Sequence, residues 1–475
     1  MLANVQHRLQ AVQMAVDVRV LGNVCYDGQM IAKTLAGWGR YPRSQATLYR
    51  PERYSRFSLP PHDKIIARGL GRSYGDAALN AQGAVVLSER LDRLLAFDET
   101  SGLLTADAGV SLASILEVFV PRGWFLPVTP GTKFCSLGGA IAADVHGKNH
   151  HRDGTLSAHV ESLSLRLADD SELQCSPTEH AELFWATVGG MGLTGIISRV
   201  QLRLMPLPSA YMQVQHHGAA NLEAILAMLA DPAYDARYSV AWIDCLASGA
   251  QLGRSVLMRG EHMEAAALPA AYAADPYRVS HRQLARLPID LPSWLLNPFT
   301  IRSFNQLYYS LQAKKGSFIS HYNSFFYPLD VLGDWNRMYG QRGFSQYQCV
   351  FPSESAGVGL QQVLEALSRS RRASFLAVLK RFGAQGEGLL SFPREGYTLA
   401  LDIPIAAGLG DLLAELDAMV IAHGGRVYLA KDAFLQPQSL PLMYPRLEAW
   451  RAIKQRYDPE QRFSSDLGRR LGLCA

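Results

Sequence analysis

Glycine-rich segments are the first sign of chemistry in this sequence. One of them, ARGLGRSYGD, runs from Ala67 to Asp76 and places three glycines within seven residues. Glycines at this spacing let backbone N–H groups approach an anion closely, which is typical of a phosphate-binding loop. By itself the pattern fits an ordinary turn equally well. It is not a Rossmann fingerprint, because no third glycine opens a crossover helix after the G-x-G pair.

Two further segments have a similar composition. Small residues dominate from Pro130 to Gly147 and would let a flat ring and a pyrophosphate lie against the backbone, while His146 stands where the segment becomes polar. From Trp185 to Ile197 the sequence is WATVGGMGLTGII, with four glycines. Three such segments in one region are hard to explain as turns alone, so they predict loops that hold a dinucleotide.

Polar residues on expected strands predict a cavity. In the strand QYQCV, Gln346 and Gln348 share one face, where a buried sheet would favour apolar side chains. Lys380 on a second strand and Asp402 on a third could add a cation and an acceptor to the same cavity, and Trp242 could form a wall. Taken singly, each of these residues fits a structural role better than a functional one.

The elements that position these residues divide the chain into regions. From 64 to 203, short β-rich runs alternate with glycine turns and an amphipathic helix at 111–120, which is typical of an α+β domain. Long strands at 237–244, 345–352, 374–380 and 397–403 predict one antiparallel sheet with helices behind it. We expect an α+β fold with two intertwined domains, the first at 30–209 and 426–475 and the second at 210–425. Residues 1–29 are expected to be a partly disordered extension.

The composition excludes several classes of protein. With 475 residues, of which 48% are hydrophobic and 19% charged, the chain is able to bury a large interior. A net charge of +4 without a basic stripe argues against nucleic acid as a partner. Six cysteines without a C-x-x-C pair predict neither a metal site nor a disulfide framework.

The hydropathy pattern predicts no membrane-spanning segment. No run reaches about 18 apolar residues and no signal peptide is evident, so we expect a cytoplasmic protein or one peripheral at the inner membrane. Apolar and aromatic residues cluster from Leu291 to Tyr309. The members of this cluster are Trp294, Leu295, Leu296, Phe299, Phe304, Tyr308 and Tyr309. We expect them to be core, with attachment to a membrane as the alternative.

The three glycine-rich segments resemble the FAD-binding domains of the vanillyl-alcohol-oxidase or PCMH class, in which two blocks hold the pyrophosphate and a third borders the isoalloxazine ring. Many members carry G-x-G-H-S, with the histidine bonded covalently to flavin. The matching residues here are Gly69-Leu70-Gly71-Arg72-Ser73. Because arginine cannot form that bond, the resemblance implies non-covalent FAD, with Arg72 free to meet a phosphate. The implied cofactor contacts are Gly69, Leu70, Gly71, Arg72, Ser73, Tyr74, Pro130, Gly131, Thr132, Ser136, Gly138, Gly139, Ala140, Ala143, His146, Gly147, Met191, Gly192, Thr194, Gly195, Ile197 and Tyr428.

Further motifs narrow the resemblance to the decaprenylphosphoryl-ribose 2′-oxidase family, the flavin half of a 2′-epimerase. They are GWGR from Gly37, GLGRSYGD from Gly69, HGKNHH from His146, QYQ from Gln346 and AKD from Ala430. The resemblance runs from about Ala36 to the C-terminus. Together with the polar strand faces, it implies substrate contacts from Tyr74, Trp242, Gln346, Gln348, Lys380, Ala400, Asp402 and Lys431.

In that family the lysine matching Lys431 contacts flavin and substrate, and the histidine matching His146 lies near the reacting hydroxyl. Hydride leaves a carbinol carbon only as its hydroxyl loses a proton, so a base must reach the oxygen while a cation stabilises the reduced flavin. Lys431 could do either, with His146 as the competing base. His150 and His151 are expected to stabilise their loop. Mycobacterial members have a cysteine at the position matching Ala400, a difference that leaves the hydride chemistry intact.

The resemblance thus implies FAD-dependent oxidation of the 2′-hydroxyl of a polyprenylphosphoryl-ribose to the 2′-keto sugar, the first step of epimerisation to the arabinose form used in cell-wall arabinan. A separate NAD(P)H-dependent reductase would complete the epimerisation. One alternative is an oxidase of a free alditol or aldonolactone, without a lipid-phosphate groove. The other is a non-catalytic FAD-binding subunit that scaffolds a reductase.

Overall fold

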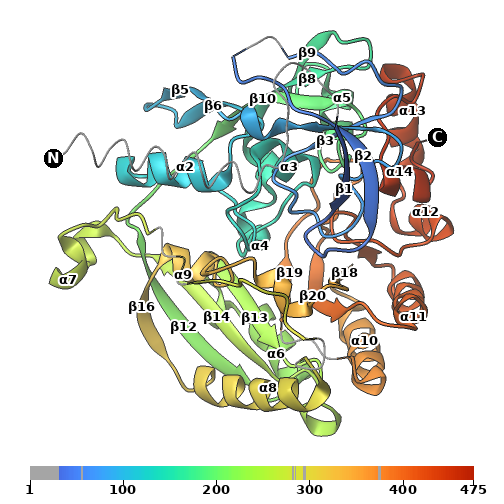
Figure 1. The fold of residues 1–475 in the computed structure, drawn as a ribbon. Helices are drawn as coiled ribbons and strands as arrows, with labels where there is room; N and C mark the ends of the chain where they lie inside the picture. The colour runs from blue at the N-terminus through green and yellow to red at the C-terminus, as the bar shows by residue number, and fades with distance from the viewer. Residues whose placement is uncertain are drawn as a thin grey trace.

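The protein consists of two halves that meet along the width of one large sheet (Figure 1). The computed structural model describes residues 31–54, 57–280, 283, 285–292, 296–372 and 376–474. The expected N-terminal extension, residues 1–29, lies outside this range. Within it, no helix is long and apolar enough to cross a membrane.

The first half contains two small sheets. One has the order β1-β2-β4-β3, in which β1 and β2 are antiparallel and the other pairs parallel. The other is antiparallel throughout, with the order β5-β6-β10-β8-β9. The strands are β1 (Ile31–Ala36), β2 (Arg43–Tyr49), β3 (Ile65–Arg68), β4 (Ala84–Leu87), β5 (Leu94–Asp98), β6 (Leu103–Asp107), β8 (Val160–Arg166), β9 (Glu172–Cys175) and β10 (Ile196–Arg203).

Helix α2 (Leu112–Phe119) shows how local sequence sets these elements. Ser111 caps its start by accepting a hydrogen bond from the Ser114 N–H. Leu112, Ile115, Leu116 and Phe119 form its buried stripe, at the spacing that a helix needs to bury one face. The chain turns away at Gly123, whose φ of 76° favours glycine. The helix expected at 111–120 is thus confirmed.

The second half is built on a single antiparallel sheet of eight strands, with the order β16-β12-β14-β13-β19-β20-β18-β21. The strands are β12 (Tyr211–Ala219), β13 (Tyr238–Ile243), β14 (Ser255–His262), β16 (Ser317–His321), β18 (Phe344–Phe351), β19 (Ala377–Phe382), β20 (Gly396–Pro404) and β21 (Arg426–Val427). This confirms the expected α+β fold with a large antiparallel sheet.

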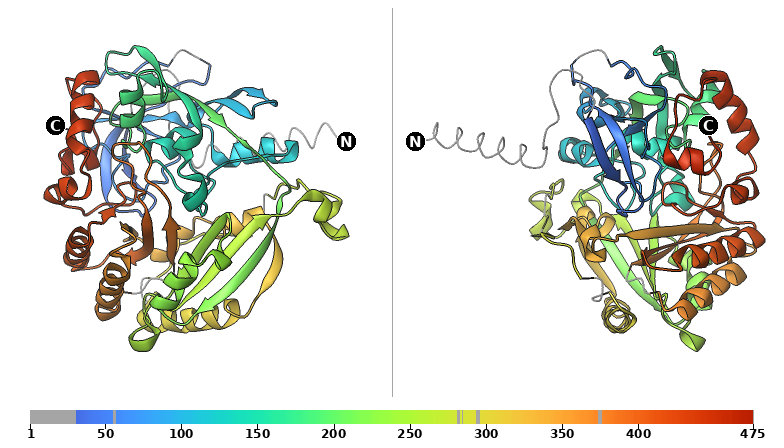
Figure 2. Two further views of the ribbon diagram at one scale, coloured as in Figure 1. Left: turned by 180° about the vertical axis from the view of Figure 1, so that it is seen from behind. Right: turned by 45° about the vertical axis from the view of Figure 1, so that its right-hand side comes forward.

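The two faces of this sheet have different neighbours. Helices α6 (Leu222–Ala230), α10 (Ala356–Ser370) and α11 (Leu409–Ala422) pack on one face. The Tyr347 hydroxyl, for example, donates to Asp417 of α11 at 2.9 Å. The opposite face is turned toward the first half, and Figure 2 shows this arrangement from two further sides. Shorter elements complete the fold: α3 (Leu137–Ala142), α4 (His150–Asp153), α5 (Ala181–Thr187), α7 (Ala270–Ala273), α9 (Tyr322–Phe326), α12 (Leu440–Met443), β7 (Trp124–Phe125), β11 (Met205–Pro206), β15 (Ala285–Arg286) and β17 (Leu332–Gly333).

The C-terminal segment packs against the first half. After β21, which pairs with β18 of the large sheet, the chain continues into α13 (Leu447–Tyr457) and α14 (Asp466–Arg470). The Trp450 indole donates to the Ala186 carbonyl at 2.9 Å, and Phe463 forms a parallel bridge with Ile65 of β3. The chain therefore leaves the large sheet after Val427 and returns to the first half.

Helix α8 (Pro298–Gln312) corrects one expectation. Ile301 and Asn305 are buried, but Phe299 is 79% exposed and Phe304 44% exposed. The interpretation of the aromatic cluster as core is therefore wrong for these two phenylalanines, because only one stripe of the helix reaches the sheet. Trp294 and Leu295, also assigned to the cluster, lie outside the described residues.

Candidate active site

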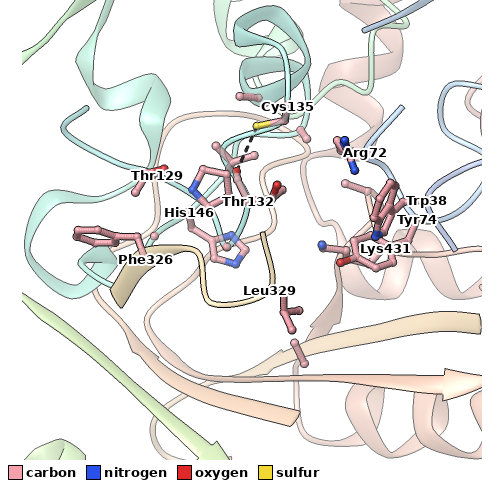
Figure 3. Close-up of a pocket in the computed structure, with 18 of the residues that line it drawn as sticks. Trp38, Arg72, Tyr74, Thr129, Thr132, Cys135, His146, Phe326, Leu329 and Lys431 are labelled. Carbon is pink, nitrogen blue, oxygen red and sulfur yellow. Dashed lines mark hydrogen bonds between the residues drawn. The ribbon is translucent and has the colours of Figure 1, made fainter. Parts of the chain in front are cut away.

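A cavity of about 560 Å³ lies between the glycine-rich loops of the first half and the large sheet (Figure 3). All three glycine-rich segments contribute to its walls, as do the strand faces that were expected to be polar. Lys431, Tyr74, Trp38 and Arg72 gather on one side of it, with His146 nearer the middle. Segments separated by hundreds of residues in sequence thus meet at one site.

The loop after β3 has the features of an anion-binding nest. Gly71 has a φ of 64°, a left-handed conformation that glycine adopts without strain. The structure gives the N–H groups of residues 70–73 no acceptor among the residues it describes. The second segment approaches closely, because a Cβ at Gly69 would lie 1.9 Å from Ser136 Oγ. Free backbone donors in a small-residue wall fit a pyrophosphate.

Two contacts of its guanidinium group, with Phe134 and Trp38, hold the Arg72 side chain in place. Its Nε donates to the Phe134 carbonyl at 2.9 Å, and the guanidinium lies 4.0 Å from the ring centre of Trp38. Burial lowers the pKa of Arg72, although Asp330 opposes this change. Sequence reasoning did not assign Trp38 to the site, and the signal available was its place beside Gly37 and Gly39. Both glycines lie against the loop carbonyl of Tyr74, where a Cβ would clash.

Most expected site residues line the cavity. On the cofactor side these are Gly69, Leu70, Gly71, Arg72, Ser73, Tyr74, Pro130, Gly131, Thr132, Ser136, Gly138, Gly139, Ala140, Ala143, His146, Gly147, Met191, Gly192, Gly195, Ile197 and Tyr428, and on the sheet side Trp242, Gln346, Gln348, Lys380, Ala400 and Lys431. Two do not line it. Thr194 is fully buried and its hydroxyl bonds with Thr187 at 2.9 Å, while Asp402 is fully buried beside its register partner Gln346, whose amide donates to it at 2.6 Å.

Lys431 lies in a turn after β21, with its N–H donating to the Tyr428 carbonyl at 2.9 Å. Its ammonium lies 3.8 Å from the ring centre of Tyr74, and the Tyr74 N–H donates to the Ala430 carbonyl at 3.0 Å. Burial lowers the pKa of Lys431 to about 7, with Asp402 acting in the opposite direction and Lys380 in the same one. The lysine is therefore able to take up or release a proton near neutral pH.

The hydrogen bonds around His146 determine which ring nitrogen carries the proton. The Thr398 hydroxyl donates to the Cys349 carbonyl at 2.8 Å, so it must accept from Gln348 Nε2 at 3.2 Å. The same amide nitrogen lies 2.9 Å from His146 Nε2, which therefore accepts its second hydrogen. The ring proton then lies on Nδ1, a buried atom that has no partner among the described residues.

Burial also keeps His146 neutral. It lowers the pKa of the imidazole well below its ordinary value, and the nearby Lys380 lowers it further. A neutral histidine with its proton on Nδ1 is a hydrogen-bond donor at that atom. His146 is thus suited to hold an oxygen atom rather than to accept its proton.

Lys148 belongs to the HGKNHH motif and lines the cavity, although the sequence predicted no role for it. Lys148 lies in the turn that follows His146, and both residues line the cavity. Its place in the HGKNHH motif, two residues after His146, was the signal that could have assigned it to the site. Its ammonium donates to the Phe325 carbonyl and lies 4.2 Å from the ring centre of Phe325.

Comparison with known proteins agrees with this geometry. The family model described as "FAD binding domain" matches residues 56–176. The chain is 38% identical over 450 residues to decaprenylphosphoryl-β-D-ribose oxidase of Mycolicibacterium smegmatis, covering 93% of this chain and 98% of that one. It is 35% identical over 376 residues to an uncharacterised Streptomyces coelicolor protein, covering 77% of this chain and all of that one. Human Δ24-sterol reductase is 26% identical over 134 residues, which is 28% of this chain and 26% of the reductase.

The fold and the site define an FAD-dependent oxidoreductase with a PCMH-type FAD-binding domain. Similarity along nearly the whole length places it more narrowly: the chain belongs to the decaprenylphosphoryl-ribose oxidase family.

Proposed function

We propose that this protein oxidises the 2′-hydroxyl of a polyprenylphosphoryl-β-D-ribose to the 2′-keto sugar. The observation that carries the proposal is the single cavity shared by the free N–H groups of the glycine loops, the titratable Lys431 and the donor His146. A flavin, a base and an oxygen-holding donor are what carbinol oxidation requires. The substrate class comes from the Mycolicibacterium smegmatis relative, which is named as an oxidase of decaprenylphosphoryl-ribose.

FAD, bound by the glycine loops and Arg72, would accept the hydride that leaves the sugar carbon. Neutral Lys431 takes the hydroxyl proton as the carbon–hydrogen bond breaks, and a carbonyl forms at that carbon. The Nδ1–H of His146 donates to the oxygen and holds it toward Lys431. Gln348 and Thr398 keep His146 in the donating form.

The same residues support a non-covalent cofactor. Arg72 stands where covalent members of the class have histidine, and its Nε is bonded to Phe134. Cys135 also lines the cavity, and burial raises the pKa of its thiol to about 12, so it is not ionised. Acid precipitation should therefore release all of the yellow colour into the supernatant. Colour retained in the protein pellet would show a covalent bond.

The substrate class implies contact with a membrane surface, because a polyprenyl chain lies in lipid. Helix α8 has the exposed features that such contact needs. Phe299, Leu307 and Leu311 are 79%, 60% and 61% exposed, and the helix contains no acidic residue. Exposed Arg302 and Lys314 add positive charge, which complements anionic lipid headgroups. The 2′-keto product would then be reduced by a separate NAD(P)H-dependent enzyme to give the arabinose form.

Anaerobic mixing with farnesylphosphoryl-β-D-ribose, a short-chain substrate, tests the proposal. The oxidised flavin band at about 450 nm should disappear after mixing. Ribose, alditols and aldonolactones at the same concentration should leave the band unchanged. Bleaching by a free sugar alone would favour the alditol or lactone oxidase, and no bleaching with any sugar would favour a non-catalytic FAD-binding subunit.

A further inference from the structure

We propose that Lys148 and Lys380 form the subsite for the phosphate of a prenyl-phosphate ligand, at the border between the polar and apolar parts of the cavity. The identity of this ligand rests on the proposed function. The subsite itself is inferred from the charges, the pairing and the position of the two lysines.

The cavity has an excess of positive charge. Among the described residues, its lining includes the cations Arg72, Lys148, Lys315, Lys380 and Lys431 and no carboxylate. Charges that face a low-dielectric cavity without counter-ions are costly unless an anion joins them. The diphosphate of FAD accounts for Arg72, which belongs to the glycine loop. Lys315 lies 3.7 Å from the ring centre of Phe318 and is exposed.

Lys148 and Lys380 are the cations that remain without a counterpart. Neither forms an ion pair with a carboxylate of the described residues, whereas Lys431 has Asp402 nearby. Burial lowers the pKa of Lys380 to about 8 and that of Lys148 to about 7, and the proximity of Lys380 contributes to the lower value. Two ammonium groups that line the same cavity repel each other, and an anion between them removes the repulsion.

The backbone places both lysines at one point of the sheet. Lys380 is on β19, where it pairs with Thr398 of β20. Lys148 enters from the loop of the first half, and its carbonyl accepts from the Ser239 N–H of β13 at 2.9 Å. Because β13 and β19 are neighbouring strands, the loop delivers Lys148 to the strand beside Lys380.

The sheet face changes character at this point. On the β18 side it presents Gln346 and Gln348. On the other side the lining is mostly apolar, with Val214, Val240, Trp242, Met258 and Phe318 on β12, β13, β14 and β16, and His216 and Ser320 are the polar residues of the same strands that line it. Polar groups, cations and apolar groups thus follow one another across the sheet. A sugar joined through phosphate to a prenyl chain has the same order, which assigns the phosphate to Lys148 and Lys380 and the chain to the apolar strands.

Binding of farnesyl phosphate to the FAD-loaded enzyme tests the assignment without turnover, with farnesol as the uncharged analogue. Isothermal titration should show that Lys148→Met and Lys380→Met each weaken farnesyl phosphate binding about 10- to 100-fold, the range for a lost charge-assisted hydrogen bond. Farnesol binding should be unchanged, and Lys380→Arg should restore most of the affinity. Lys33→Met, which removes an exposed lysine of β1, is the matched control.

Three results would overturn the subsite. The first is equal weakening of farnesyl phosphate and farnesol, which would make the lysines part of the packing. The second is unchanged binding of both ligands. The third is loss of FAD from the variants, which would assign the lysines to the cofactor.

Stability gives a second, independent measurement. Removing a half-buried ammonium that has no counter-ion relieves a desolvation cost, so Lys380→Met should raise the melting temperature of the ligand-free enzyme. A lower melting temperature would show a structural role and overturn the proposal. Failure of the proposed reaction can be told apart from failure of the subsite. If ribosyl substrates do not bleach the flavin, farnesyl phosphate should still bind in a way that depends on the two lysines.

Discussion

At the scale of single residues, burial gives Lys431 and His146 different roles in the proposed reaction because it changes the pKa of each. Lys431 is close to half protonated at neutral pH because burial lowers its pKa to about 7. The neighbouring His146 is neutral, and Gln348 fixes its proton on Nδ1. One residue can therefore accept the hydroxyl proton while the other donates to the oxygen. The two roles follow from hydrogen bonding and burial, not from residue type alone.

Replacing Lys431 by methionine should leave FAD bound but slow flavin reduction by about 100- to 10,000-fold, the usual contribution of a general base. As the pH increases toward 7, the wild-type rate of flavin reduction should rise about tenfold per pH unit, and above pH 7 it should level off. The reason is that Lys431 must be neutral to act as the base. The groups facing Lys431 are Asp402, Lys380 and Cys135, which influence its pKa. Stopped-flow spectroscopy of anaerobic reduction, with Lys33→Met as the control, measures both effects.

A rate that falls as the pH rises would contradict the role of Lys431 as base. It would show instead that the protonated ammonium is needed, as expected for a cation that stabilises reduced flavin. Reduction at an unchanged rate in Lys431→Met would remove the lysine from the mechanism altogether.

The sequence indicated which residues face the cavity where alternation along a strand was decisive. Gln346 and Gln348 follow period two, and both line the cavity. Thr194 and Asp402 do not line it. Thr194 is bonded to Thr187 in the core, and Asp402 shares the sheet face of its register partner Gln346 but is fully buried there, where it accepts from Gln346 and Tyr339. Local sequence carries no information on depth, because depth depends on which segment packs in front.

At the scale of elements, α8 links the cavity to the outer surface. Asn297 caps its start in a capping box with Thr300, which fixes where the helix begins. One side of the helix carries Tyr308, whose ring is 4.8 Å from that of Trp242 in the cavity wall. The other side exposes Phe299 and Leu307. A helix placed in this way would bring a membrane-borne chain directly to the apolar end of the cavity.

The double variant Phe299→Ser, Leu307→Ser should weaken binding to vesicles of phosphatidylglycerol and phosphatidylcholine by at least about tenfold, because each side chain loses apolar area buried in lipid. Sedimentation with vesicles measures the bound fraction. Leu442→Ser, at a site on α12 that is 67% exposed, is the matched control and should bind like wild type. Equal binding of the double variant and wild type would exclude α8 as the contact.

Periodicity predicted the elements well where one face is buried. The strands β13, β18 and β20 and the helix α2 lie within a few residues of their expected positions. The aromatic cluster on α8 was misjudged for a physical reason. A run of apolar residues denotes a buried face only if something covers it, and the sequence does not show that the sheet contacts only the stripe containing Ile301.

At the scale of the whole molecule, the order of the strands in the large sheet could not be predicted from local sequence pattern. The large sheet joins β18 to β21 and β13 to β19, pairs whose members are separated by more than one intervening element. Such pairings are set by the burial of whole faces and not by neighbouring residues. The expectation of one antiparallel sheet with helices behind it was confirmed, whereas the order of its strands could not be derived.

The C-terminal helix joins the glycine loop to the Lys431 turn. Arg470 donates to Asp76 at 2.8 and 2.9 Å and to Asp432 at 2.9 Å. Asp76 follows the glycine loop directly, and Asp432 follows Lys431. Both carboxylates are buried, at 3% and 7% exposure, so the guanidinium between them is needed to offset their desolvation. One side chain near the end of the chain thus holds both walls of the cofactor side together.

Arg470→Met should therefore lower the free energy of unfolding by about 3–5 kcal/mol, the cost of leaving buried charges unpaired. Burial already raises the pKa of Asp76 and Arg470 opposes this rise, so without Arg470 the carboxyl would be protonated at higher pH. Since a protonated carboxyl carries no charge to desolvate, the deficit should be full near pH 7 and shrink as the pH falls. Denaturant unfolding of the holoenzyme at pH 7 and pH 5 measures this deficit.

The control variant Arg451→Met removes an exposed ion pair with Glu448 and should lower the free energy of unfolding by at most about 1 kcal/mol. A deficit no larger than that of Arg451→Met would mean that the cofactor loop and the Lys431 turn are held by packing alone.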